Sequence, residues 1–245
     1  MFPGLALIAH CPDDAGMARE RIVSGESQGG EKDSAPEPSV SSGPVVRPKT
    51  LQDYVGQAAL VERLSIAMEA VKGRGESMEH VLLHGPPGLG KTTLAHVIAN
   101  EMGSTAWVTS GPALNKAADL VGTLTKLGEG DVLFIDEIHR LPPAVEEYIY
   151  PAMEDFKVDF TVDSGMHAKV ITLTLKPFTL IGATTRAGML TQPLRARFGI
   201  THHLEYYPHS DLIEILKRAV VRMGISTVAV SGFDAIAERS RGTPR

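Results

Sequence analysis

A phosphate-binding loop is the strongest chemical signal in the sequence. Residues 85–92 read GPPGLGKT, which fits G-x-x-x-x-G-K-[ST] and lies between an apolar run and a segment with helical spacing. Glycines let successive backbone N–H groups turn inward around phosphates, and the following helix adds its positive end. Lys91 can then reach the β and γ phosphates, and the Thr92 hydroxyl can ligate Mg²⁺. The alternative is a glycine-rich strand-to-helix turn that binds no ligand. That alternative would not explain why every fixed position of the motif is matched. The nucleotide residues predicted here are Gly85, Pro86, Pro87, Gly88, Leu89, Gly90, Lys91, Thr92 and Thr93.

Two adjacent carboxylates form the second chemical signal. Asp136 and Glu137 directly follow the apolar run DVLFI at 131–135, so they lie where a buried strand would end. Asp136 is predicted to hold the Mg²⁺ shell. Glu137 is predicted to orient and deprotonate the water that attacks the γ-phosphate. The alternative is an exposed acidic turn after a buried strand, but the phosphate loop favours the catalytic interpretation.

Three further residues can be given a candidate role only because the carboxylate pair and the phosphate loop are present. Thr185 directly follows the run FTLIGAT, where its hydroxyl could sense the γ-phosphate between the loop and the carboxylates. Arg197 lies in PLRARF beyond the predicted sheet edge, and Arg245 lies in GTPR. Taken alone, each arginine reads as an ordinary surface charge.

Predicted helices and predicted strands alternate along the chain, and together they must position these residues. Apolar residues recur at helical spacing from Val61 to Val71, and further helices are predicted at 91–102, 119–127 and 142–153. Short apolar runs predict buried strands at 80–83, 106–109, 131–135 and 178–181. Strands that alternate with helices imply a parallel sheet covered on both faces. Functional residues are then expected at the carboxyl ends of the strands.

Two segments depart from the alternation. Residues 156–175 show period-two apolar spacing on both sides of Asp163, Ser164 and Gly165, which predicts a β-hairpin inserted before the next core strand. After Pro208 the spacing is helical again, which predicts the start of a small helical lid domain at 208–245.

The composition limits which classes of protein this chain can belong to. The chain has 245 residues, of which 43% are hydrophobic, so it can bury a large core. Its net charge of −5 gives no general argument for nucleic acid or membrane binding, and no segment is long enough to span a bilayer. A lone cysteine, Cys11, cannot form an internal disulfide, which favours the cytoplasm. Residues 12–46 are rich in Asp, Glu, Ser, Gly and Pro, and residues 1–46 are expected to form a disordered acidic leader.

Several longer runs resemble the RuvB family of AAA+ motor ATPases, which drive branch migration of Holliday junctions. The resemblance extends over residues 47–245, and the runs that carry it are RPKTLQDYVGQ, GPPGLGKTTLA, EGDVLFIDEIHRLP, YPAMEDF, FTLIGATTRAGML, PLRARFGI and SRGTPR. The loop and the carboxylate pair alone would indicate only the AAA+ class. IDEIHRLP, YPAMED and GATTRAG are more specific.

The resemblance implies a role for each matching residue. Tyr54 and Val55 would pack near the adenine of ATP, Thr185 would be the sensor after the fourth strand, and Arg245 the lid sensor. Arg197 would be the arginine finger donated to the ATP of a neighbouring subunit. It also implies a homo-hexamer on duplex DNA at Holliday junctions. The hairpin at 156–175 would dock a RuvA-like junction-binding protein, with a RuvC-like resolvase in the same complex.

The expected organisation is an α/β fold, an AAA+ P-loop core with an inserted hairpin and the beginning of a lid. The large ATPase domain is predicted at 47–207. The family's chain continues into a winged-helix domain, which we expect to be absent after Arg245. Two alternatives remain open: a truncated module that binds nucleotide and partner with little turnover, and another AAA+ ATPase such as a clamp loader.

Overall fold

A parallel sheet of five strands forms the centre of the computed structural model, which describes residues 46–74, 76–161, 170–225 and 228–245. The strand order is β2-β3-β6-β1-β7, and every pairing is parallel. The strands are β1 (Val81–His84), β2 (Ala106–Ser110), β3 (Val132–Asp136), β6 (Thr179–Thr184) and β7 (Ile200–His203). The α/β fold class predicted from the sequence is confirmed. The predicted leader at 1–46 lies, except for residue 46, outside the described residues.

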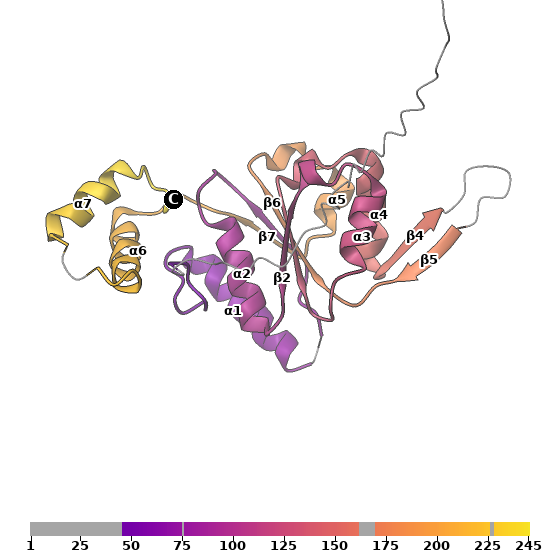
Figure 1. The fold of residues 1–245 in the computed structure, drawn as a ribbon, viewed down its shortest axis with the longest axis horizontal. Helices are drawn as coiled ribbons and strands as arrows, with labels where there is room; N and C mark the ends of the chain where they lie inside the picture. The colour runs from indigo at the N-terminus through magenta and orange to yellow at the C-terminus, as the bar shows by residue number, and fades with distance from the viewer. Residues whose placement is uncertain (1–45, 75, 162–169, 226–227) are drawn as a thin grey trace, which may run out of the picture. The chain divides into compact units, whose positions relative to one another are not determined.

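Alternate side chains of the central strands enter two separate hydrophobic cores. Leu83 and Phe134 belong to one cluster, whereas their neighbours Leu82 and Leu133 belong to the other. This alternation follows from the two-residue period of a strand. The first core is covered by α1 (Ala58–Lys72) and α2 (Lys91–Met102), and the second by α3 (Ala117–Leu124) and α4 (Pro143–Glu154) (Figure 1).

Helix ends follow local chemistry more closely than hydrophobic spacing does. Helix α3 begins at Ala117 rather than at the predicted Asp119, because the Asp119 carboxylate accepts the backbone N–H of Lys116 at 2.9 Å and so caps the first turn. It ends at Leu124, three residues before the predicted end. Helix α2 is bounded by Gly90 and Gly103, both in the left-handed region.

The predicted hairpin consists of β4 (Lys157–Thr161) and β5 (Val170–Thr174), which pair in antiparallel fashion. The predicted turn at 163–165 lies outside the described residues. Val158 is fully buried in the second core, whereas Val170 and Ile171 are 58% and 40% exposed. The ribbon therefore anchors one side to the core and presents apolar side chains to solvent.

A short helix, α5 (Gln192–Ala196), was not predicted because five residues cannot display a helical repeat. The Thr191 hydroxyl caps it by accepting the Leu194 N–H. Two longer helices, α6 (His209–Arg222) and α7 (Val230–Arg239), follow the sheet.

The α6–α7 segment is attached to the rest of the described chain at several points. The Tyr207 N–H donates to the Gly242 carbonyl at 2.9 Å, so the segment begins and ends at one place. Arg222 pairs with Asp53 at 3.0 Å, and Leu212 is buried in the first core. Among the described residues, no helix combines the length and apolar character needed to cross a membrane.

A substitution at Gly85 tests the close packing of the phosphate loop against the backbone of Leu204. Its φ is +143°, and a Cβ there would lie 2.6 Å from the Leu204 carbonyl oxygen. We expect Gly85→Ala to lower the free energy of unfolding by about 1–3 kcal/mol, because alanine meets both backbone strain and a backbone clash. Urea unfolding followed by circular dichroism measures this.

Gly122→Ala is the matched control. Gly122 lies within α3 with no heavy atom within 4 Å of a built Cβ, so alanine there should leave stability unchanged or raise it by up to about 1 kcal/mol. Superimposable unfolding curves for the two variants would contradict the account of Gly85.

Candidate nucleotide-binding site

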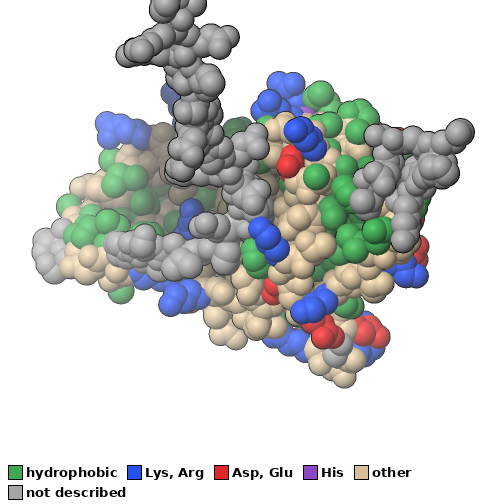
Figure 2. Space-filling view, turned by 45° about the vertical axis from the view of Figure 1, so that its right-hand side comes forward, with side chains coloured by type: hydrophobic (Ala, Val, Ile, Leu, Met, Phe, Trp, Pro, Cys, Tyr) green, Lys and Arg blue, Asp and Glu red, His purple; other side chains and the backbone are tan. Residues whose placement is uncertain are grey.

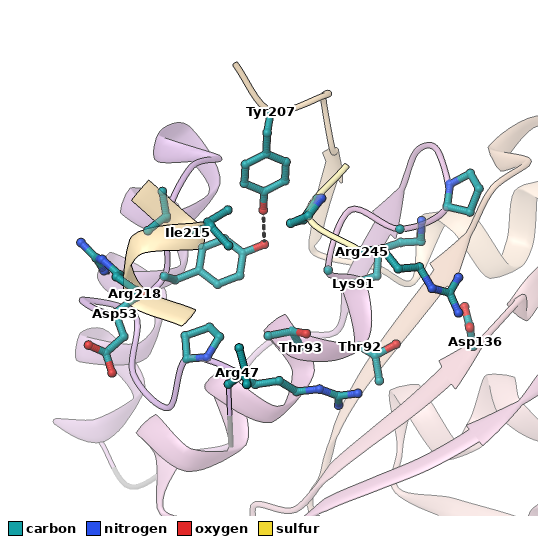
Figure 3. A pocket seen from close by; sticks show the side chains of 18 of the residues that line it. Arg47, Asp53, Lys91, Thr92, Thr93, Asp136, Tyr207, Ile215, Arg218 and Arg245 are labelled. Atoms are coloured by element: carbon teal, nitrogen blue, oxygen red, sulfur yellow. Dashed lines mark hydrogen bonds between the residues drawn. The ribbon is translucent and has the colours of Figure 1, made fainter. Parts of the chain in front are cut away.

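A cavity of about 520 Å³ lies at the carboxyl end of the sheet, within the size range of small-molecule sites (Figure 3). It is formed by the segment before α1, the phosphate loop, the ends of β3 and β6, helix α6 and the last two residues. Twelve of the residues predicted from the sequence line it: Tyr54, Val55, Pro87, Gly88, Gly90, Lys91, Thr92, Thr93, Asp136, Glu137, Thr185 and Arg245.

Three loop residues predicted to touch the nucleotide do not line the cavity. Gly85 and Pro86 instead offer their carbonyls to the Lys91 Nζ, at 2.9 and 2.8 Å. Leu89 is fully buried in the first core, which anchors the loop from beneath. The carbonyls of Gly85 and Pro86 therefore hold the Lys91 ammonium group, and the buried Leu89 side chain holds the loop.

Lys91 is the cation at the floor of the cavity. Burial lowers the pKa of its ammonium group, while the nearby carboxylates of Asp136 and Glu137 act in the opposite direction. Helix α2 begins at Lys91, so its first N–H groups and dipole favour an anion at the same place. The arrangement suits a polyphosphate.

The two carboxylates differ in how the chain holds them. Asp136 ends β3 and accepts the Glu137 N–H at 3.0 Å. Glu137 adopts a left-handed conformation with φ +49°, which is uncommon for a residue with a side chain. A Cβ at Gly111 would lie 2.5 Å from the Glu137 carbonyl oxygen, so this turn packs directly against glycine. Such strain is often retained at functional sites.

Thr185 lies beside Glu137, as the sequence predicted. Its Oγ1 is 3.4 and 3.5 Å from the two carboxylate oxygens of Glu137. Thr185 directly follows β6, which pairs with β3 on one side and with β1 on the other. The hydroxyl therefore stands between the carboxylates and the phosphate loop.

The opposite end of the cavity is more apolar. The hydroxyls of Tyr54 and Tyr207 are 3.0 Å apart, and the dashed line in Figure 3 marks this contact. Burial is the main cause that raises the pKa of Tyr54, and the neighbouring Tyr207 adds to it. Ile215 of α6 lines the same part of the cavity. Tyr54, Tyr207 and Ile215 offer a planar base a surface to pack against.

The sequence analysis assigned no role to several residues that line the cavity: Arg47, Asp53, Tyr207, Ile215, Arg218 and Arg222. They reach the cavity through long-range contacts. The Arg218 guanidinium, for example, donates to the Asp53 carbonyl at 3.0 Å across 165 positions of sequence. Single-sequence spacing does not encode such pairs.

Arg197 does not line the cavity of its own chain. Its guanidinium stacks over the Tyr150 ring at 4.3 Å, pairs with Glu154 at 3.1 Å and donates to the Pro193 carbonyl at 2.7 Å. The side chain is 21% exposed. It is therefore ordered at a different surface from Lys91 and Asp136.

Thr92 and Asp136 offer one hydroxyl and one carboxylate to a metal ion at the cavity. Oxygen ligands of this kind suit Mg²⁺, which prefers one or two protein ligands plus phosphate oxygens and water. No group of three or more His, Cys, Asp or Glu within the described ranges could hold a metal ion. The donor set thus fits an ion brought in with a nucleotide.

Comparisons with known proteins give consistent results. Residues 46–204 match the family model described as the Holliday junction DNA helicase RuvB P-loop domain. Proteins named Holliday junction branch migration complex subunit RuvB from Chlorobium luteolum and Prosthecochloris aestuarii are each 56% identical over 200 residues. The matches cover 82% of this chain, which spans 58% of the length of these curated relatives.

The solved structure of the Thermotoga maritima RuvB Holliday junction branch migration motor is 52% identical, with a TM-score of 0.71. The match covers 82% of this chain and 62% of that chain. The family model accounts for more than half of the sequence, and it includes both the phosphate loop and the carboxylate pair. The chain therefore belongs to the RuvB family and contains that family's P-loop domain, an α/β core of the AAA+ type.

Proposed function

We propose that this chain binds and hydrolyses ATP as part of a Holliday junction branch migration motor acting in DNA recombination and repair. The observation that carries the proposal is the convergence of Lys91, Thr92, Asp136, Glu137 and Thr185 on one cavity. These residues come from the loop after β1 and from the ends of β3 and β6. Membership of the RuvB family supports the same assignment.

Each residue has a distinct part in the proposed reaction. Lys91 binds the β and γ phosphates, and Glu137 orients a water for in-line attack and accepts its proton. Thr185 contacts the γ-phosphate side of the site, and Tyr54 and Val55 contact the base. Thr92 and Asp136 would hold Mg²⁺, which neutralises charge on the phosphates when bound.

Arg197 is proposed to complete the site of a neighbouring subunit in a homo-hexamer. Its absence from the cavity of its own chain supports use in trans. A guanidinium placed there would stabilise charge that develops on the transferred phosphoryl group. Arg245, which does line the cavity, is proposed to sense nucleotide from the lid side.

The partners proposed for the motor follow from the family. They are duplex DNA at a Holliday junction, a RuvA-like protein and a RuvC-like resolvase, with the cytoplasm as location. On the face shown in Figure 2, Lys and Arg side chains stand in separate groups rather than in one continuous band. The DNA assignment is taken from the RuvB relatives.

Glu137→Gln and Lys91→Ala should separate hydrolysis from binding. Glu137→Gln keeps nucleotide affinity but lowers the hydrolysis rate by at least about 10²-fold, because an amide cannot accept the proton of the water. Lys91→Ala weakens affinity by about 10- to 100-fold, because hydrogen bonds to charged phosphates are lost. Titration with a fluorescent nucleotide and a phosphate-release assay measure the two effects.

Exposed residues supply the matched controls, Glu129→Gln and Lys126→Ala. Both should behave as the parent. Parental hydrolysis by Glu137→Gln would overturn the base assignment, and nucleotide binding without any turnover by the parent would favour a binding module.

Arg197→Ala should leave nucleotide binding intact and reduce hydrolysis by about 10³- to 10⁵-fold, the usual worth of an arginine finger. Mixed with Lys91→Ala subunits, some interfaces would join an intact loop to an intact arginine, so activity should partly return. Phosphate release from verified mixed oligomers measures this, with Arg74→Ala as an exposed control. Failure to complement would count against a shared site.

The β4–β5 ribbon should dock the RuvA-like partner through its exposed apolar side chains. Ile171→Asp should abolish capture by immobilised RuvA while ATP binding stays unchanged, because the ribbon lies outside the nucleotide cavity. Thr174→Asp adds the same charge at another exposed position of β5 and is the control. Equal capture of both variants would rule out Ile171 as a contact.

A further inference from the structure

His139 connects the candidate base to the end of β6. Its Nε2 lies 3.2 Å from the Glu137 Oε2, and its Nδ1 lies 2.8 Å from the Thr184 Oγ1. The His139 side chain is only 4% exposed, whereas that of Glu137 is 32% exposed and lines the nucleotide cavity. The imidazole thus sits behind the carboxylate, on the side away from the nucleotide.

The contacts at the two ring nitrogens favour one tautomer of a neutral His139. The Thr184 Oγ1 accepts the backbone N–H of Arg186 at 2.9 Å, which leaves its own O–H free to donate to the His139 Nδ1. In a neutral ring the proton then resides on Nε2, where it can be donated to the Glu137 carboxylate. The opposite tautomer would set a lone pair against that carboxylate.

The backbone of Glu137 is fixed independently of its side chain. Its left-handed turn is closed by the Arg140 N–H, which donates to the Glu137 carbonyl at 2.8 Å, and by the close approach of Gly111. What stays free is rotation of the side chain. Within the described part of the chain, His139 contacts the carboxylate at Oε2, and the Thr185 hydroxyl lies near both of its oxygens.

We propose that His139 is a positioning residue that holds the Glu137 carboxylate toward the attacking water and is itself oriented by the Thr184 hydroxyl. The inference rests on the proposed role of Glu137 as base. It adds a physical link: Thr184 precedes Thr185, so movement at the phosphate-sensing end of β6 is transmitted to the base through the imidazole. Thr184 is fully buried and does not line the cavity, so its hydroxyl reaches the site through His139 and through the Arg186 N–H that it accepts.

The test compares His139→Ala, Thr184→Val and Thr184→Ser in the full chain. The first two should lower the single-turnover rate of ATP hydrolysis by about 10- to 100-fold, because small displacements of a catalytic group are costly. Nucleotide affinity should change less than about threefold. Thr184→Ser, which restores the hydroxyl, should recover most of the rate that the isosteric Thr184→Val loses. An unchanged or faster rate in His139→Ala overturns the proposal.

Two further measurements separate this proposal from the assignment of the base. In the Glu137→Gln background, His139→Ala should cause no additional loss, whereas a further tenfold loss would mean that His139 acts elsewhere. If Glu137→Gln alone hydrolyses ATP at the parental rate, the assignment of Glu137 as the base is wrong, whereas the contact between His139 and the side chain at position 137 is not tested by that result. Histidine ¹⁵N–¹H spectra need no turnover at all. They should show His139 as the Nε2–H tautomer, with the signal displaced in Thr184→Val, and an Nδ1–H tautomer would overturn the proposal.

Discussion

The nucleotide site depends on the insertion of β6 between β3 and β1. Parallel pairing aligns Gly182 with Ile135 of β3 and Thr184 with His84 of β1. The carboxylates after β3 and the phosphate loop after β1 therefore end at one edge, with the residues after β6 between them. The Gly85 N–H donates to the Thr184 carbonyl at 3.1 Å and extends this alignment into the loop. Backbone hydrogen bonds thus set the spacing of the reacting groups before any side chain contributes.

Much of the fold could be predicted from the sequence because each element shows its own period. The apolar runs that end near Leu83 and Ile135 are the strands, and the glycines beside them bound the helices. Strand order could not be predicted from period alone, since β6 pairs with residues about 100 positions away. The edge strand β7 contains threonine and two histidines, so burial patterning gives little indication that it lies beside β1.

The candidate site likewise contains residues that could be predicted from the sequence and residues that could not. Lys91, Asp136 and Glu137 belong to short motifs whose chemistry fixes their spacing, and the structure gathers them at one cavity. Their roles remain predictions. His139 lies in the IDEIHRLP run and Tyr207 in no motif, but neither could be given a role from the sequence, because their contacts with Thr184 and Tyr54 join distant segments of chain. Residues that orient others are defined by three-dimensional neighbours, so one sequence alone does not reveal them.

Arg197 illustrates how the fold can prepare a side chain before it meets a partner. An unconstrained arginine has about 2 kcal/mol of rotamer entropy to lose when it is immobilised. Stacking on Tyr150 and the bond to the Pro193 carbonyl have already removed much of that freedom. Its Nε is buried without a hydrogen-bond partner among the described residues, so the ordering is achieved by the rest of the guanidinium. An anion that later binds this arginine exchanges with the exposed Glu154 carboxylate, and the entropic cost of ordering the cation has been met during folding.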